Sequence, residues 1–195
     1  MKYNSLQLTA GGKKEHRREL DFYPTPKECT IALMNFLNLP KSKILEPACG
    51  NGSMADVIKS YGHEVFASDI SEVYGYGLGG IDYLVTKFEG YDAVITNPPF
   101  AASSRFIQKA LTESPIVAML LKSQYWHSKS RYNLFMDNIP SYVLPLTWRP
   151  NFAQYKGKAP TMEVFWTVWN EGDRLTKYIP LLKPTTIKKD NEKTI

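Results

Sequence analysis

The sequence holds few of the residues that build disulfide frameworks or metal centres. Its two cysteines, Cys29 and Cys49, and its three histidines are scattered without the short spacings of zinc sites. We therefore expect reduced thiols and no metal. Apolar runs long enough to cross a bilayer are also absent, since Ile116–Leu121 has only the length of a strand. We expect a protein that does not enter membranes.

The two ends of the chain lack apolar patterning. Residues 1–20 are polar and basic, without the apolar centre of a signal peptide. We expect a flexible basic arm there and a disordered, charged tail over residues 183–195. Residues 21–182 contain no internal repeat and no shift of composition, which predicts a single domain in a cytoplasmic protein.

An excess of positive charge is the clearest feature of the composition. The net charge of +5 and the isoelectric point near 9.0 favour a polyanionic partner. Many basic proteins have no such partner, so charge alone leaves nucleic acid an even choice.

Short apolar runs alternate with helical segments, which indicates an α/β fold with a mostly parallel, twisted sheet and helices on both faces. A short element is expected to end at Ile81-Asp82, after a glycine-rich stretch. The expected helices cover residues 26–39, 53–61, 103–112 and 131–138. The expected strands are Lys43–Glu46, Glu64–Ser68, Tyr91–Thr96, Ile116–Leu121, Tyr142–Leu146 and Glu163–Trp169.

The segment Asn97-Pro98-Pro99-Phe100 stands out because it follows a buried strand and cannot continue it. Both prolines lack an N–H, and Pro98 restricts Asn97 to an extended backbone. A stiff corner that displays an amide and a ring is expected where the strand ends. Open α/β sheets bind ligands at that edge, so this corner is our hypothesis for the reaction centre.

A glycine loop, Glu46-Pro47-Ala48-Cys49-Gly50-Asn51-Gly52, joins the first strand to a helix. It lacks the Lys-Ser/Thr of a phosphate loop and the third glycine of the dinucleotide fingerprint, which favours a cofactor without phosphates. Asp69 ends the second strand, where an acidic residue can hold ribose hydroxyls. Asp82 can accept a hydrogen bond from an adenine amino group, although it also suits a plain turn.

These motifs, in this order, resemble class I S-adenosylmethionine-dependent methyltransferases. The corner resembles that of small, bacteriophage-type enzymes that methylate N6 of adenine in DNA, some in restriction-modification. The resemblance spans roughly residues 21–169 and implies a Rossmann-like methyltransferase fold, S-adenosylmethionine as cofactor, and a bacterial or phage-infected host cell. The implied cofactor-binding residues are Tyr23, Thr25, Pro26, Glu46, Pro47, Ala48, Gly50, Gly52, Asp69, Ile70 and Asp82. Thr25 is also expected to cap the helix that begins at Pro26.

The resemblance also implies a catalytic role for the corner. The side-chain oxygen of Asn97 and the Pro98 carbonyl would each accept one hydrogen of the adenine amino group, so that the nitrogen lone pair points at the methyl group. Neither Pro98 nor Pro99 has an N–H that competes for this geometry. Phe100 would stack on the adenine, which must be flipped out of double-stranded DNA. A core position remains the other reading of the Phe100 ring.

A large target-recognition region does not fit in 195 residues. If the last strand runs antiparallel, two basic loops with aromatic rings lie beside Asn97 and favour DNA contact. The rings are Tyr125, Trp126, Trp148, Phe152 and Tyr155, and the expected DNA contacts are Lys122, Ser123, Gln124, Lys129, Arg149, Lys156 and Lys158. So small a DNA-recognition surface predicts short or relaxed sequence specificity. RNA adenine, a protein glutamine, and DNA binding without turnover remain alternatives.

Overall fold

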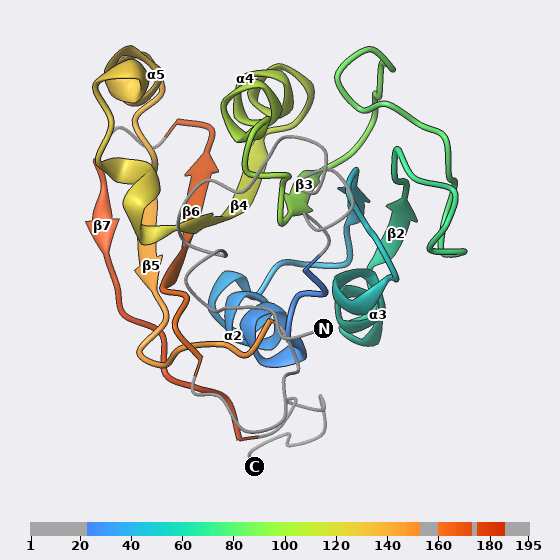
Figure 1. The fold of residues 1–195 in the computed structure, drawn as a ribbon, viewed down its shortest axis with the longest axis horizontal. Coiled ribbons are helices and arrows are strands. Elements are labelled where there is room, and N and C mark those ends of the chain that lie inside the picture. The colour runs from blue at the N-terminus through green and yellow to red at the C-terminus, as the bar shows by residue number, and fades with distance from the viewer. Residues whose placement is uncertain (1–22, 153–159, 173–174, 186–195) are drawn as a thin grey trace, which may run out of the picture.

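A seven-stranded sheet organises the computed structural model, which describes residues 23–152, 160–172 and 175–185 (Figure 1). The predicted arm over residues 1–20 and most of the predicted tail lie outside these ranges. The strands are β1 (Lys43–Glu46), β2 (Glu64–Ala67), β3 (Ala93–Thr96), β4 (Ile116–Lys122), β5 (Tyr142–Pro145), β6 (Val164–Asn170) and β7 (Lys177–Tyr178).

The strand order is β2-β1-β3-β4-β6-β5-β7. The first four strands of this order pair in parallel, as expected for strands joined through helices. β6 lies antiparallel between β4 and β5. The predicted Rossmann-like fold is therefore confirmed, and β6, the last strand that the sequence predicted, is antiparallel as expected. The carboxyl ends of β1, β2, β3 and β4 share one edge of the sheet.

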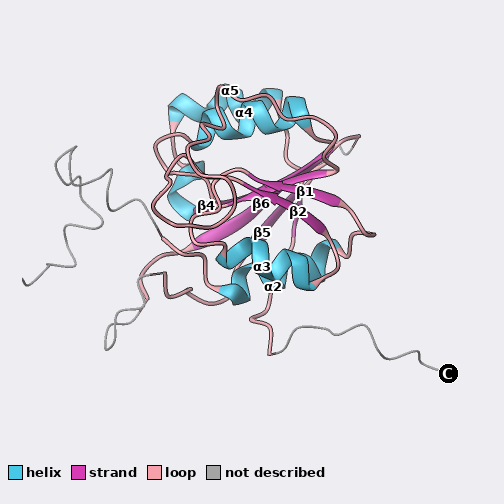
Figure 2. Ribbon diagram, turned by 90° about the vertical axis from the view of Figure 1, so that its right-hand side faces the viewer, coloured by secondary structure: helices cyan, strands magenta, loops and turns pink. Residues whose placement is uncertain are grey.

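Helices cover both faces of the sheet (Figure 2). α2 (Lys27–Leu37) and α3 (Ser53–Ser60) lie on one face, and α4 (Ser103–Glu113) and α5 (Tyr132–Asp137) lie on the other. The alternation along β3 shows why: Ala93 and Ile95 pack in the cluster with α2 and α3, whereas Val94 packs with α4. No helix in the described ranges is long and apolar enough to cross a membrane.

A buried hydrogen bond fixes α2 to the sheet. The indole Nε1 of Trp166, on β6, donates to the Cys29 carbonyl at 2.9 Å, and the Trp166 side chain is fully buried. A buried indole N–H needs such a partner, because leaving it unpaired costs about 1–3 kcal/mol. Since α2 continues directly from the segment at Tyr23, this bond also places that segment at the carboxyl edge of the sheet.

Several parts of the chain differ from the prediction. The element expected to end at Ile81-Asp82 is reduced to one bridge between Ser68 and Leu78. Gly77 explains the close approach there, because it has φ +65 and a Cβ on it would lie 2.3 Å from the Ala67 carbonyl oxygen. The sequence also did not predict β7, or the short 3₁₀ helices η2 (Ser123–Trp126) and η3 (Lys129–Arg131).

Candidate active site

A cleft of about 1340 Å³ opens at the carboxyl ends of β1, β2 and β3. It brings together most of the residues that the sequence nominated for the cofactor and for catalysis. Those lining the cleft are Tyr23, Thr25, Glu46, Pro47, Ala48, Gly50, Asp69, Ile70, Asp82, Asn97, Pro98, Pro99 and Phe100. Pro26 and Gly52 are not among its lining residues.

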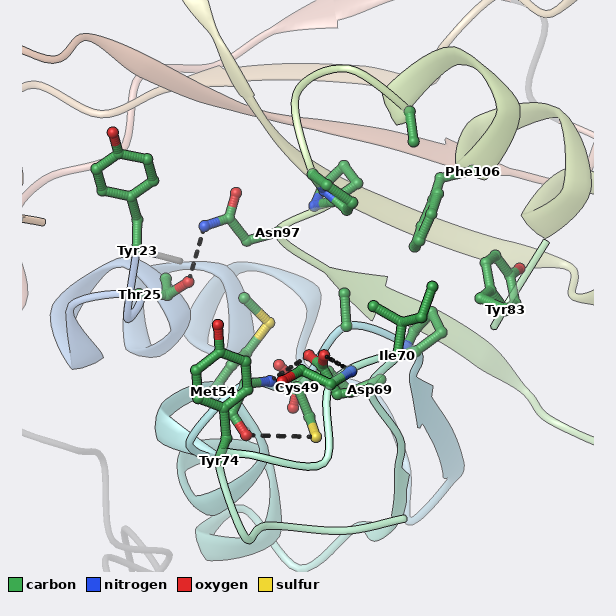
Figure 3. A pocket seen from close by; sticks show the side chains of 18 of the residues that line it. Tyr23, Thr25, Cys49, Met54, Asp69, Ile70, Tyr74, Tyr83, Asn97 and Phe106 are labelled. Atoms are coloured by element: carbon green, nitrogen blue, oxygen red, sulfur yellow. Dashed lines mark hydrogen bonds between the residues drawn. The ribbon is translucent and has the colours of Figure 1, made fainter. Parts of the chain in front are cut away.

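Asp69 ties the glycine loop to the end of β2 (Figure 3). Its Oδ2 accepts the Gly50 backbone N–H at 2.8 Å, and its Oδ1 accepts the Ser71 backbone N–H at 2.8 Å. The side chain is buried, yet each carboxylate oxygen keeps a second lone pair for a ligand hydroxyl. Asp69 therefore shapes the loop and also remains able to bind at the cleft.

Asp82 shares its carboxylate between a turn and the cleft. Its Oδ1 accepts the Leu84 backbone N–H at 2.9 Å, which is the turn geometry that the sequence left open as an alternative. The residue also lines the cleft, so the two readings are compatible.

Gly52 serves the packing of the loop. It has φ +79, and a Cβ on it would lie 2.3 Å from the ring of Tyr76. The Tyr76 hydroxyl in turn donates to Asp56 Oδ1 at 2.6 Å and accepts from Lys59 Nζ at 3.0 Å. Gly52 therefore leaves room for the Tyr76 ring, which joins α3 to the glycine-rich stretch. The sequence did not reveal this role.

Glu46 places a buried carboxyl at the cleft. The residue is only 2% exposed, and its Oε2 has no hydrogen-bond partner among the described residues. Burial raises the pKa of Glu46 well above its usual range, and the Ala55 backbone N–H only partly offsets this. Burial likewise raises the pKa of the Cys49 thiol to about 12. An unpaired buried oxygen in the cleft wall is a site for a ligand's donor or cationic group.

The corner after β3 is braced by hydrogen bonds within the turn and by one from Thr25. The Pro99 carbonyl accepts the Ala102 backbone N–H at 2.9 Å and the Ser103 hydroxyl at 3.1 Å. The side-chain Nδ2 of Asn97 donates to the Thr25 hydroxyl at 3.1 Å (Figure 3). The prediction that Thr25 caps α2 is wrong, because Pro26 occupies the cap position and the Thr25 hydroxyl is turned to Asn97.

Phe100 and Lys122 meet beside this corner. The Lys122 Nζ lies 3.5 Å from the centroid of the Phe100 ring, within the range of a cation–π contact. The Tyr23 ring also lies beside the Phe100 ring, and the two ring centroids are 5.9 Å apart. Phe100 is half-buried and lines the cleft, so it is not a core ring.

The other predicted DNA contacts are placed unevenly. Arg149 Nη2 bonds the Glu163 carboxylate at 2.7 Å, and the Glu163 carbonyl accepts the Ser123 backbone N–H, so these residues adjoin the end of β4. Gln124 and Lys129 are exposed. Lys156, Lys158 and Tyr155 lie outside the described residues.

Two of the predicted aromatic contacts are wrong. Phe152 is 6% exposed and Tyr125 is 9% exposed, and both belong to apolar clusters of the core. The Tyr125 ring also carries the guanidinium of Arg131 at 4.1 Å. Both rings pack in the core against the sheet, a tertiary contact that the sequence does not show.

The cleft also contains residues that sequence reasoning missed. Tyr74, Tyr83 and Phe106 line it, as does the exposed Arg105 in the first turn of α4. Only Arg105 carried a usable signal, since it follows the corner directly on a predicted helix. Within the described ranges, no three His, Cys, Asp or Glu side chains are grouped as metal ligands would be.

Solved structures share this fold at low sequence identity. A proposed class I S-adenosylmethionine-dependent methyltransferase from Listeria monocytogenes has a TM-score of 0.63 at 13% identity, over 93% of this chain and 70% of its own. A type I restriction-modification methyltransferase subunit from Streptococcus thermophilus has 0.65 at 12% identity, over 81% and 47%. A proposed RNA methyltransferase from Pyrococcus horikoshii has 0.61 at 18% identity, over 85% and 95%.

No family profile matches the sequence, and no curated protein is detectably similar to it. At these identities the likeness establishes the Rossmann-like fold seen in methyltransferases. The chain spans about half the length of the Streptococcus subunit, at 47% of that chain.

Gly52→Ala is expected to destabilise the protein more than Gly62→Ala. Both glycines have a positive φ, +79 and +87, where alanine costs about 1–2 kcal/mol. Only at Gly52 does the new methyl group meet a ring, that of Tyr76, which adds about 1–3 kcal/mol of overpacking. Chemical denaturation of the two variants measures the difference, and equal losses would contradict the packing role of Gly52.

Glu46→Gln is expected to raise Tm at about pH 8 and to have little effect at about pH 4. The raised pKa means that Glu46 contributes stability that is complete below its usual value of 4.5 and is lost as pH rises toward the folded pKa. Each kcal/mol recovered by glutamine raises Tm by about 2–4 °C. Thermal denaturation against pH tests this, with the exposed Glu64→Gln as control. A gain that did not depend on pH would refute it.

Proposed function

We propose that the protein transfers a methyl group from S-adenosylmethionine to the N6 amino group of adenine in double-stranded DNA, with short or relaxed sequence specificity. The observation that carries this proposal is the position of the Asn97 amide. It lies at the end of a central parallel strand, and the Thr25 hydroxyl holds it at the cleft. The Rossmann-like fold shared with methyltransferases supports the reaction class.

The cleft suits this cofactor residue by residue. Bound S-adenosylmethionine supplies an electrophilic methyl group on a sulfonium centre. The buried Glu46 carboxyl offers an unpaired oxygen to the cationic end, and Asp69 keeps lone pairs for ribose hydroxyls. Ile70, which is 67% exposed at the cleft, offers apolar surface to an adenine ring. Asp82 has Oδ2 left to accept from the amino group of that ring.

The corner suits an amino nucleophile. The Asn97 amide donates through Nδ2 to Thr25, which leaves its Oδ1 as an acceptor. The hydrogen bonds that brace the turn end on the Pro99 and Phe100 carbonyls, and none from a described residue reaches the Pro98 carbonyl. These two acceptors would take both amino hydrogens and turn the nitrogen lone pair toward the methyl group. Such catalysis depends on positioning and electrostatics.

The rim beside the corner suits a polyanion that presents an extruded base. Phe100 offers a ring for stacking, and Lys122 places a cation on that ring. Arg149 and the exposed Gln124 and Lys129 extend the polar surface beyond the end of β4. Arg105 adds a cation at the cleft itself. Within the described residues these contacts are few, which favours recognition of a short sequence.

RNA adenine and a protein glutamine are the second candidates. An amide nitrogen presents the same delocalised lone pair to the Asn97 corner, and one structure of similar fold is a proposed RNA methyltransferase. A binding protein that has lost turnover is disfavoured, because both the corner and the glycine loop keep their polar groups directed at one cleft.

Transfer of a labelled methyl group is expected onto unmethylated double-stranded DNA, with N6-methyladenine as the digestion product. The assay includes RNA and protein in parallel arms. Label in RNA or in protein alone would replace DNA as the substrate. Tight DNA binding without transfer to any of the three would overturn the enzymatic assignment.

Asn97→Ala is expected to reduce transfer by about 10²–10³-fold, the order seen when one hydrogen-bonding group that stabilises a transition state is removed. The affinity for S-adenosylmethionine, measured by calorimetry, should remain nearly unchanged. Asn97→Asp keeps an acceptor oxygen and should retain more activity than the alanine variant. The exposed Asn133→Ala is the matched control on α5. Normal turnover in Asn97→Ala would exclude the corner from catalysis.

A further inference from the structure

The hydrogen bond between Asn97 and Thr25 joins segments that are 72 residues apart in the chain. We propose that Thr25 is a positioning residue, which turns the Asn97 amide so that Oδ1 faces the substrate amino group. We propose further that a cleft ligand that accepts the Thr25 hydroxyl hydrogen locks this orientation. The inference rests on the proposed role of Asn97 and deepens it.

An asparagine amide has two unlike ends, so its orientation decides what the corner does. With Oδ1 toward the substrate, the amide accepts an amino hydrogen. Rotated by half a turn, it presents the Nδ2 hydrogens to the amino group, and two donors then face each other. The strand before it fixes the backbone of Asn97 but does not distinguish these two states. Among the described residues, the Thr25 hydroxyl is the group that forms a hydrogen bond with the side-chain amide of Asn97.

Thr25 is itself held firmly. It is 7% exposed and lies between Pro24 and Pro26, whose rings fix the backbone on both sides. As a β-branched residue it also has restricted side-chain rotamers. The segment continues into α2, which Trp166 bonds to the sheet. The oxygen that meets Asn97 therefore belongs to a rigid support.

The hydrogens at Thr25 explain how a ligand acts on Asn97. A hydroxyl has one hydrogen to donate and two lone pairs to accept. In the structure one lone pair accepts from Asn97 Nδ2, and no described residue takes the hydrogen. That hydrogen could instead be given to Oδ1 of a rotated amide. Thr25 lines the cleft, so a bound ligand with an acceptor there takes the hydrogen and leaves Thr25 only its acceptor role.

The test compares three variants of the full-length chain. Thr25→Val keeps the shape and removes the hydroxyl, whereas Thr25→Ser keeps the hydroxyl. The matched control is Thr30→Val, because Thr30 lies on α2, is fully buried, and has a hydroxyl without a partner among the described residues. Thermal denaturation first establishes that each variant is folded.

Two readouts are followed in each variant. The first is kcat together with the affinity for S-adenosylmethionine. The second is the side-chain amide signal of Asn97 in ¹⁵N NMR spectra, assigned by its loss in Asn97→Ala, with and without S-adenosylhomocysteine. This signal reports the orientation of the amide without any turnover.

In Thr25→Val we expect kcat to fall about tenfold or more, with a smaller change in cofactor affinity. Its Asn97 amide signal should shift and should no longer respond to S-adenosylhomocysteine as the wild-type signal does. Thr25→Ser and Thr30→Val should behave like the wild type. An unchanged Asn97 signal in Thr25→Val, or an equal fall of kcat in Thr25→Ser or Thr30→Val, would overturn the inference. If the wild type methylates nothing, the proposed function fails, and the NMR comparison still decides the role of Thr25.

Discussion

The absence of two backbone donors at Pro98 and Pro99 is the constraint on which this structure depends. β3 is buried on both faces in the middle of the sheet, and it ends at Thr96, directly before Asn97 and the two prolines. Without N–H groups the next residues cannot extend the ladder, and the Asn97 side chain is left at the edge. The end of β3 therefore fixes the positions of the Asn97 amide, the Phe100 ring and the start of α4.

A second network, centred on Asp69, holds the opposite wall of the cleft. One carboxylate fixes both the glycine loop and the turn after β2, so a residue suited to ligand binding also maintains the shape of its own pocket. The Glu46 carboxyl is the opposite case: its Oε2 has no hydrogen-bond partner among the described residues, and its burial weakens the free protein at neutral pH. The cleft thus combines one carboxylate whose two oxygens both accept hydrogen bonds with a carboxyl that has an unpaired oxygen.

The sequence predicted the strands, the helices and the cleft well, because each depends on local patterns. Strand breaks at prolines, the Glu46–Gly52 loop and an acid at the end of β2 are all visible within a few residues. What it could not show was which long-range partner would claim a side chain. Thr25 has the chemistry of a helix cap, and Phe152 has that of a stacking ring, until tertiary packing places them at Asn97 and in the core.

The bond from Trp166 to Cys29 links residues 137 positions apart. Contacts of such separation are slow to form, because the loop that they close costs entropy before any contact repays it. α2, and the segment of Tyr23 and Thr25 that leads into it, is anchored to the sheet through β6, a strand that is synthesised well after β3. During synthesis, therefore, Thr25 and Asn97 are both made well before Trp166, and the segment that bonds the Asn97 amide is anchored to the sheet only after β6 has been made.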